Sequence, residues 1–169
     1  MEFKLKTISK AAIPEAISKA ELYRSLNEPE EAESICRDVL AVEPEHQLGL
    51  RLLGLAITDQ FAGDSSDRHG EAHELFQKLA SNYERLYYTG LLHERRAKAQ
   101  MRVGHSPHNL APLFEEAMRC FAEAEVIHPP DNDDAVLRWN RCARLLQSHP
   151  GFCEEKESEA FDAFDSSPV

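Results

Sequence analysis

Six basic side chains in the second half of the chain stand at helical spacing and could recognise an anion. They are Arg95, Lys98 and Arg102 in one stretch and Arg138, Arg141 and Arg144 in another. Steps of three and four residues place side chains on one face of a helix. Because a guanidinium group is planar and forked, it binds a carboxylate through two parallel hydrogen bonds. The pattern indicates a binding groove for an acidic peptide. The alternative is a set of surface salt bridges with Glu94, Asp133 and Asp134.

Apolar and amide side chains near these cations would complete such a groove. The stretch 47–60 is apolar on more than one face, as expected of a helix that is buried on several sides. Its leucines are therefore either the apolar floor of the groove or plain core, while Asn140 could hold a ligand backbone through its amide. The expected peptide-binding residues are Leu48, Leu52, Leu55, Arg95, Lys98, Arg102, Arg138, Asn140 and Arg141.

One acidic residue falls where core residues are expected. Glu94 lies on a helical line that otherwise consists of Tyr87, Gly90, Ala97 and Met101. A buried carboxylate must be paired with a cation to be tolerated. We therefore expect Glu94 to pair with Arg138 or Arg141.

Patterns for catalysis or metal binding are weak. His105 and His108 are three residues apart, and His69 and His73 are four apart. Zinc requires three or four converging ligands, and no further Cys or His is spaced to complete a local set. No nucleophile motif or Gly-rich phosphate loop is present, although a Cys–His pair could still meet in the fold. We expect no enzyme, cofactor or metal, and keep a small enzyme or metal-binding protein as an alternative.

Short amphipathic helices must position these residues. Ala20, Tyr23 and Leu26 lie at helical spacing before Asn27-Glu28-Pro29, where proline ends one helix and suits the first turn of the next. Helices this short are marginal alone in water, so each must pack on a neighbour. Apolar stripes and breakers predict helices at about 13–26, 29–42, 47–60, 70–81, 83–103, 112–127 and 133–147, with Pro112 opening the sixth and Gly104 ending the fifth.

The spacings between small and bulky residues recur along the chain. Gly54 follows Ala20 by 34 residues, and a bulky residue follows a small one by four at Ala32–Cys36, Ala72–Phe76 and Ala117–Phe121. Over residues 13–147 this pattern resembles the tetratricopeptide repeat family, with extra residues in the second and third repeats. The resemblance implies an all-α array of antiparallel helical hairpins, an α-solenoid of three irregular repeats and a capping helix. The first helix of each pair would line a concave binding surface.

The resemblance implies a non-enzymatic adaptor that binds a protein or peptide. Some members of the family clamp the C-terminal carboxylate of chaperones with Lys and Asn on consecutive first helices. Ile17, Glu21 and Leu52 stand at the corresponding points here and cannot make those contacts. We therefore expect a different ligand.

The composition of the chain restricts the classes of protein to which it can belong. The chain has 169 residues, 29% of them charged, and a formal net charge of −11, which is ordinary for one globular domain and opposes binding to nucleic acid or an anionic membrane. The most apolar window, Leu48–Ile57, is too short for a bilayer, and no apolar run follows the N-terminal lysines. Together with a buried reduced thiol expected at Cys36, these features predict a cytoplasmic protein. Trp139 is expected to be a core or capping aromatic.

The chain divides into a lead-in (1–12), the helical domain (13–147) and an acidic tail (148–169). Residues 154–165 contain six acids against Lys156, a composition typical of disorder, and Phe152, Phe161 and Phe164 are spaced like anchors. One hypothesis is that this tail docks on the basic groove, in cis or in a second copy, which would make a self-associating module. Otherwise it is a solubilising tail. The expected state is a monomer or weak homodimer.

Overall fold

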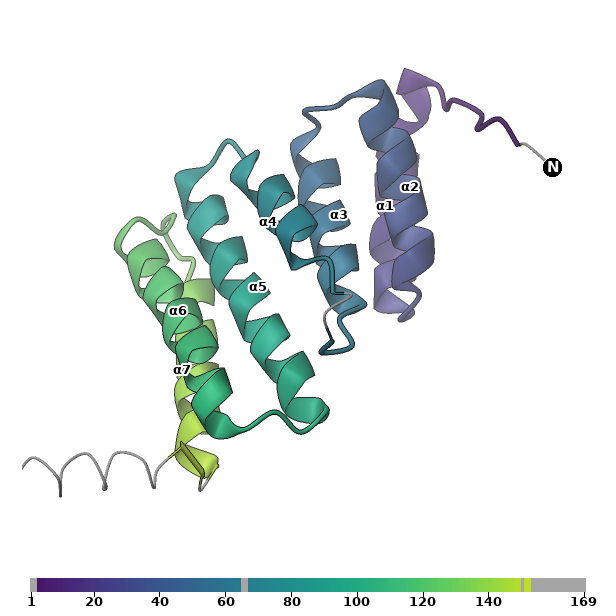
Figure 1. The fold of residues 1–169 in the computed structure, drawn as a ribbon. Helices are drawn as coiled ribbons and strands as arrows, with labels where there is room; N and C mark the ends of the chain where they lie inside the picture. The colour runs from purple at the N-terminus through teal and green to yellow at the C-terminus, as the bar shows by residue number, and fades with distance from the viewer. Residues whose placement is uncertain (1–2, 65–66, 150, 153–169) are drawn as a thin grey trace, which may run out of the picture.

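A computed structural model describes residues 3–64, 67–149 and 151–152. All regular structure in this part of the chain is helical, and the helices follow one another in an array of side-by-side neighbours (Figure 1). After a short 3-10 helix, η1 (Lys10–Ala12), the helices are α1 (Ile13–Ser25), α2 (Pro29–Val42), α3 (Gln47–Asp59), α4 (His69–Gln77), α5 (Asn82–Arg102), α6 (Pro107–Val126) and α7 (Asp134–Ser148). The prediction of an all-α array of about seven helices is confirmed.

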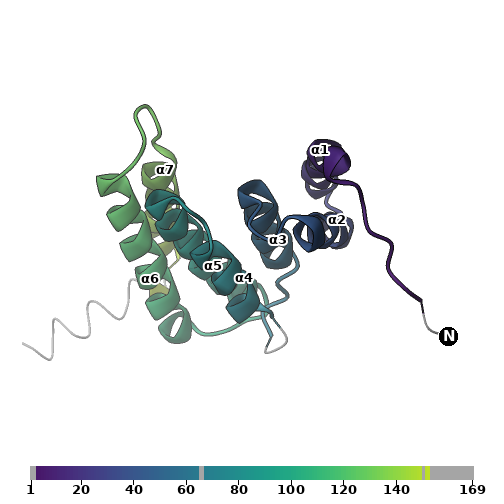
Figure 2. The same ribbon diagram turned by 90° about the horizontal axis from the view of Figure 1, so that it is seen from above.

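The array has two sides. Besides packing on its successor, each odd-numbered helix contacts the next odd-numbered one, so that α1, α3, α5 and α7 touch in turn. Seen from above, these four helices follow one side of the array and α2, α4 and α6 the other (Figure 2). Side chains on neighbouring odd-numbered helices can therefore meet across a common surface, which we call the inner face.

Local sequence explains where the helices begin and end. His46 Nδ1 and Ser81 Oγ accept hydrogen bonds from the backbone N–H groups of Gly49 and Glu84, which caps the starts of α3 and α5. Pro29 occupies the first turn of α2. Gly104 has a φ of 89°, the left-handed conformation that glycine adopts after a helix. The predicted end of the fifth helix at Gly104 is therefore confirmed.

Glycine allows the helices to approach closely in two equivalent places. A Cβ atom built on Gly54 of α3 would lie 2.4 Å from the ring of Phe76 in α4, and one on Gly90 of α5 would lie 2.8 Å from the ring of Phe121 in α6. Both phenylalanine side chains are fully buried. Each glycine–phenylalanine pair thus allows close packing of the two helices of a hairpin.

The start of the sixth helix differs from the prediction. We expected it at Pro112, but α6 begins at Pro107, and Pro112 lies inside the helix. Pro107 can open a helix equally well, because the first-turn position needs no N–H partner. The longer helix carries Leu110 into the core, where its side chain is 1% exposed. Burial of that leucine accounts for the earlier start.

Packing continues at both ends of the predicted helical domain. The α7 helix extends one residue past the expected boundary, to Ser148, and Phe152 packs edge-on against Phe114 with ring centroids 5.9 Å apart. At the other end, Ile8 packs against the core. Trp139 is not a core residue, because its side chain is 38% exposed, so of its two predicted roles only that of a capping aromatic remains. None of the described helices is long and apolar enough to cross a bilayer.

Candidate functional site

An aspartate joins the first three helices of the inner face. Asp59, at the end of α3, accepts a hydrogen bond from Arg24 of α1 at 2.7 Å and one from Arg95 of α5 at 2.5 Å. Arg95 Nη1 also donates to Thr58 Oγ1 at 2.5 Å and to the carbonyl of Leu55 at 3.2 Å. Burial lowers the pKa of Arg95 in spite of the nearby Asp59. Arg95 is therefore largely occupied within the protein and acts as a bridge between α5 and α3.

A buried glutamate joins α5 to α7. Glu94 is 0% exposed, its Oε1 atom accepts a hydrogen bond from Lys98, and its Oε2 atom lies 3.6 Å from Arg138 Nη1. The expectation that Glu94 is buried and pairs with Arg138 is confirmed. Burial opposes the charged form of Arg138, but its hydrogen bond with Tyr87 and the charge of Glu94 prevail, so the pKa of Arg138 is raised.

Two other predicted cations have fewer partners. Arg102 donates to the carbonyl of Phe61 at 3.2 Å, and Arg141 is exposed. Neither lies in an ion pair with another described residue. We call Arg24, Arg95, Lys98, Arg102, Arg138 and Arg141 the basic row. In the described part of the chain its six cations share two carboxylates, those of Asp59 and Glu94.

The three leucines predicted for the groove do not form an accessible surface. The side chains of Leu52 and Leu55 are 3% and 8% exposed and belong to the core, which corrects their assignment as peptide-binding residues. The reason is that α3 is packed against α1, α2, α4 and α5. Leu48 is half-buried and packs against the same core. Asn140 is half-buried on α7.

A second feature of the inner face was missed from the sequence. A cavity of about 250 Å³ opens between α3, α5 and the α6–α7 connection. We call it the tyrosine pocket, and its lining residues are Arg51, Ser81, Tyr83, Glu84, Tyr87, Tyr88, Pro129, Asn132 and Asp134. The available signal was the clustering of three of the chain's four tyrosines within six residues.

Hydrogen bonds hold the walls of the tyrosine pocket in place. The Tyr83 hydroxyl donates to Asn132 Oδ1 at 3.1 Å, and the same oxygen accepts from the backbone N–H of Asp134 at 3.0 Å. Arg51 of α3 pairs with Glu84 of α5 at 3.0 Å. Burial, and next the charge of Asp134, raise the pKa of Tyr83 to about 12. The tyrosine therefore stays neutral and keeps its hydrogen bond at physiological pH.

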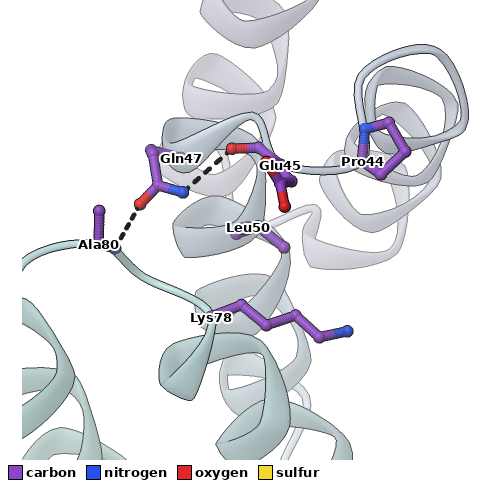
Figure 3. Close-up of a pocket in the computed structure, with 6 residues that line it drawn as sticks. All are labelled: Pro44, Glu45, Gln47, Leu50, Lys78 and Ala80. Atoms are coloured by element: carbon purple, nitrogen blue, oxygen red, sulfur yellow. Dashed lines mark hydrogen bonds between the residues drawn. The ribbon is translucent and has the colours of Figure 1, made fainter.

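A larger cavity lies at the turns that connect the helices, away from these residues. Its volume is about 570 Å³, and it is lined by Pro44, Glu45, Gln47, Leu50, Lys78 and Ala80 (Figure 3). Gln47 Oε1 accepts from the N–H of Ala80 at 2.7 Å, and its Nε2 donates to the carbonyl of Glu45 at 3.0 Å. Gln47 thus links the turn before α3 to the turn before α5, and its side-chain amide is engaged by these two hydrogen bonds.

Residues suited to nucleophilic or metal chemistry are not assembled in the described part of the chain. No group of three or more His, Cys, Asp or Glu side chains there could hold a metal ion. Burial raises the pKa values of Cys36, Cys120 and Cys142 to about 12, 11 and 12, so these thiols are protonated at neutral pH and are poor nucleophiles. Cys36 is the buried free thiol expected from its helical stripe.

Comparisons with protein-family models, with curated proteins and with solved structures gave no match for this chain. The arguments about function therefore rest on the inner face, its basic row and the tyrosine pocket.

Proposed function

We propose that this protein is a non-enzymatic adaptor that binds an acidic segment of another protein on its inner face. It would be an irregular three-repeat member of the tetratricopeptide repeat family. A cytoplasmic location and a monomeric or weakly dimeric state go with this proposal. Lys98, Arg102, Arg138 and Arg141 are the principal anion contacts, and Arg95 supports them from its bridge to Asp59.

The observation that carries the proposal is the excess of cations in the basic row. Its six cations share two carboxylates within the described residues, whereas the whole chain has a net charge of −11. Clustering of uncompensated positive charge on an acidic protein raises the local concentration of an anionic ligand and speeds its association. Exposed guanidinium groups then supply paired hydrogen bonds to carboxylates.

A peptide titration tests the proposal. The probe is a synthetic peptide with the sequence of residues 154–165, EEKESEAFDAFD, and its control has Gln and Asn in place of every acid. We expect the acidic peptide to bind the full chain and the neutral one to bind much more weakly. Arg102→Glu and Arg141→Glu should each reduce affinity about fivefold, whereas Lys19→Glu, an exposed reversal on α1, should not.

The result that would contradict the proposal is equal binding of the two peptides, or equal losses in Lys19→Glu and Arg141→Glu. The self-association alternative is tested in the same titration. Residues 154–165 lie outside the described part of the chain, so docking of the tail stays a hypothesis. If the tail occupies the basic row, removing residues 153–169 will increase affinity for the peptide; unchanged affinity and salt dependence would rule docking out.

A further inference from the structure

The tyrosine pocket has a shape and a charge distinct from those of the basic row. Its volume of about 250 Å³ is below the roughly 300–1,000 Å³ typical of small-molecule sites. It lies over the first turns of α5, whereas Lys98 and Arg102 lie in the last turns of the same helix. The pocket is therefore suited to one long side chain of a partner that also reaches the basic row.

The rings form a corner. Tyr83 and Tyr87 are stacked, with ring centroids 5.8 Å apart and planes 15° apart. The ring of Tyr88 meets Tyr87 at 83°, with centroids 5.0 Å apart. Tyr88 is held from behind by stacking on Phe76 at 5.3 Å. A corner of fixed aromatic rings offers π faces and edges that do not need to be ordered when a ligand binds.

The charged groups of the pocket favour a cation. Of its charged lining residues, Arg51 and Glu84 are paired with each other at 3.0 Å. This leaves the carboxylate of Asp134, which makes no ion pair with any described residue and which, after burial, is the next cause that raises the pKa of the neighbouring Tyr83. Arg138 of the basic row also reaches this wall through its hydrogen bond with Tyr87, but it is paired with Glu94. An anion would be repelled by Asp134, and an apolar side chain would gain nothing from it. A cation would gain from both the carboxylate and the rings.

We infer that the tyrosine pocket receives an arginine side chain of the protein partner, whose guanidinium group stacks against the tyrosine corner and faces Asp134. Arginine suits the site better than lysine because its planar group stacks on aromatic faces and is more weakly hydrated. The inference rests on the proposed function and extends it, because the partner protein would carry two features that this chain recognises. These are a basic residue at the tyrosine pocket and an acidic segment along the basic row.

The test uses a small probe that contains no acidic group. N-acetyl-arginine amide is titrated into the full chain and tyrosine ring resonances are followed by NMR, with N-acetyl-citrulline amide as the neutral, nearly isosteric control. The arginine compound should shift Tyr83, Tyr87 and Tyr88 saturably and leave Tyr23 of α1 unaffected. The citrulline compound should bind at least about threefold more weakly, because it lacks the charge.

Matched charge variants test whether the arginine compound binds beside Asp134. Asp134→Asn should weaken the arginine compound about threefold and leave the citrulline compound unchanged, while Glu125→Gln, an exposed substitution on α6, should alter neither. Equal affinity for the two compounds, equal loss in both variants, or the absence of a saturable shift would each overturn the inference. Failure of the acidic-peptide titration alone would instead overturn the proposed function, because this probe does not require the basic row.

Discussion

Glu94 is tolerated in the core because two cations reach it, Lys98 from its own helix and Arg138 from α7. Its side chain has no exposed surface. Its Oε1 atom accepts a hydrogen bond from Lys98, while Oε2 lies 3.6 Å from Arg138 Nη1, which is an ion pair without a hydrogen bond. Replacing it with glutamine keeps the shape and removes the charge that holds both cations. Loss of one partner from a buried pair is costly because the remaining charges stay partly desolvated.

We predict that Glu94→Gln lowers the free energy of unfolding by about 2 kcal/mol, since hydrogen bonds between charged groups contribute about 1.5–3 kcal/mol each. Urea denaturation monitored by circular dichroism measures this change. Glu116→Gln is the matched control, because Glu116 pairs with Arg119 on the exposed surface of α6, where such pairs contribute about 0–1 kcal/mol. A loss in Glu94→Gln no greater than that of the control would contradict this role.

At the scale of single residues the sequence predicted the burial of Glu94 and its partner on α7, but not its second partner, Lys98, one turn along the same helix. Glu94 and its partner Arg138 followed from a helical line and from the rule that buried charge is paired. Leu52 and Leu55 were ambiguous, because an apolar residue on a crowded helix can face either a ligand or the core. Asp59 was missed, since its two arginine partners lie 35 and 36 residues away.

At the scale of elements, a second ion-pair network holds the outer side of the array. Glu33 of α2 accepts two hydrogen bonds from Arg68, at 2.8 and 2.7 Å, two from Arg37, at 3.0 and 2.7 Å, and one from Gln60, at 2.7 Å. Arg68 stands just before α4 and Gln60 just after α3. The network therefore ties α2 to both ends of the connection between α3 and α4.

The same network should make stability depend on pH. The hydrogen bond from Arg68 is the main cause that lowers the pKa of Glu33 from 4.5 to about 2. Because the folded pKa is depressed, the stabilisation is fully present above pH 4.5 and is lost as pH falls from 4.5 towards 2. Allowing for screening by solvent around the arginines, we expect it to amount to about 1–2 kcal/mol near neutral pH.

Comparison with Glu33→Gln measures this contribution. The difference in unfolding free energy between wild type and Glu33→Gln should be largest at pH 6 and shrink as the pH approaches 3. Glu30→Gln, which removes an exposed carboxylate from the same helix, should show little difference at any pH. A gap for Glu33→Gln that stays constant between pH 6 and pH 3 would contradict the assignment.

Most element boundaries followed from local signals, but α4 ends at Gln77, four residues before the predicted end. Helix α2 begins and ends at the predicted residues, because Pro29 and the Glu43–Glu45 break are unambiguous. The start of α6 was wrong because Pro107 and Pro112 are both suited to a first turn. Burial of Leu110 selected the longer helix. Such a choice depends on tertiary packing, which the local pattern does not contain.

At the scale of the whole molecule, the stacking of odd-numbered helices creates the inner face. Neighbouring helices bring Arg24, Asp59, Arg95, Glu94 and Arg138 into one connected series of charges. The sequence predicted the array and several of these cations. It did not predict the tyrosine pocket, because that cavity forms only where the connection between α6 and α7 meets α5 and α3.

The central claim is that the basic row is the surface on which an acidic segment binds. The most direct measurement is a map of backbone NMR shifts while the isotopically labelled full chain is titrated with the acidic peptide of residues 154–165. The account predicts saturable shifts concentrated in the second half of α5 and along α7, around Lys98, Arg102 and Arg141. Shifts concentrated instead on α2, α4 and α6, or around Lys78 at the turns, would contradict it.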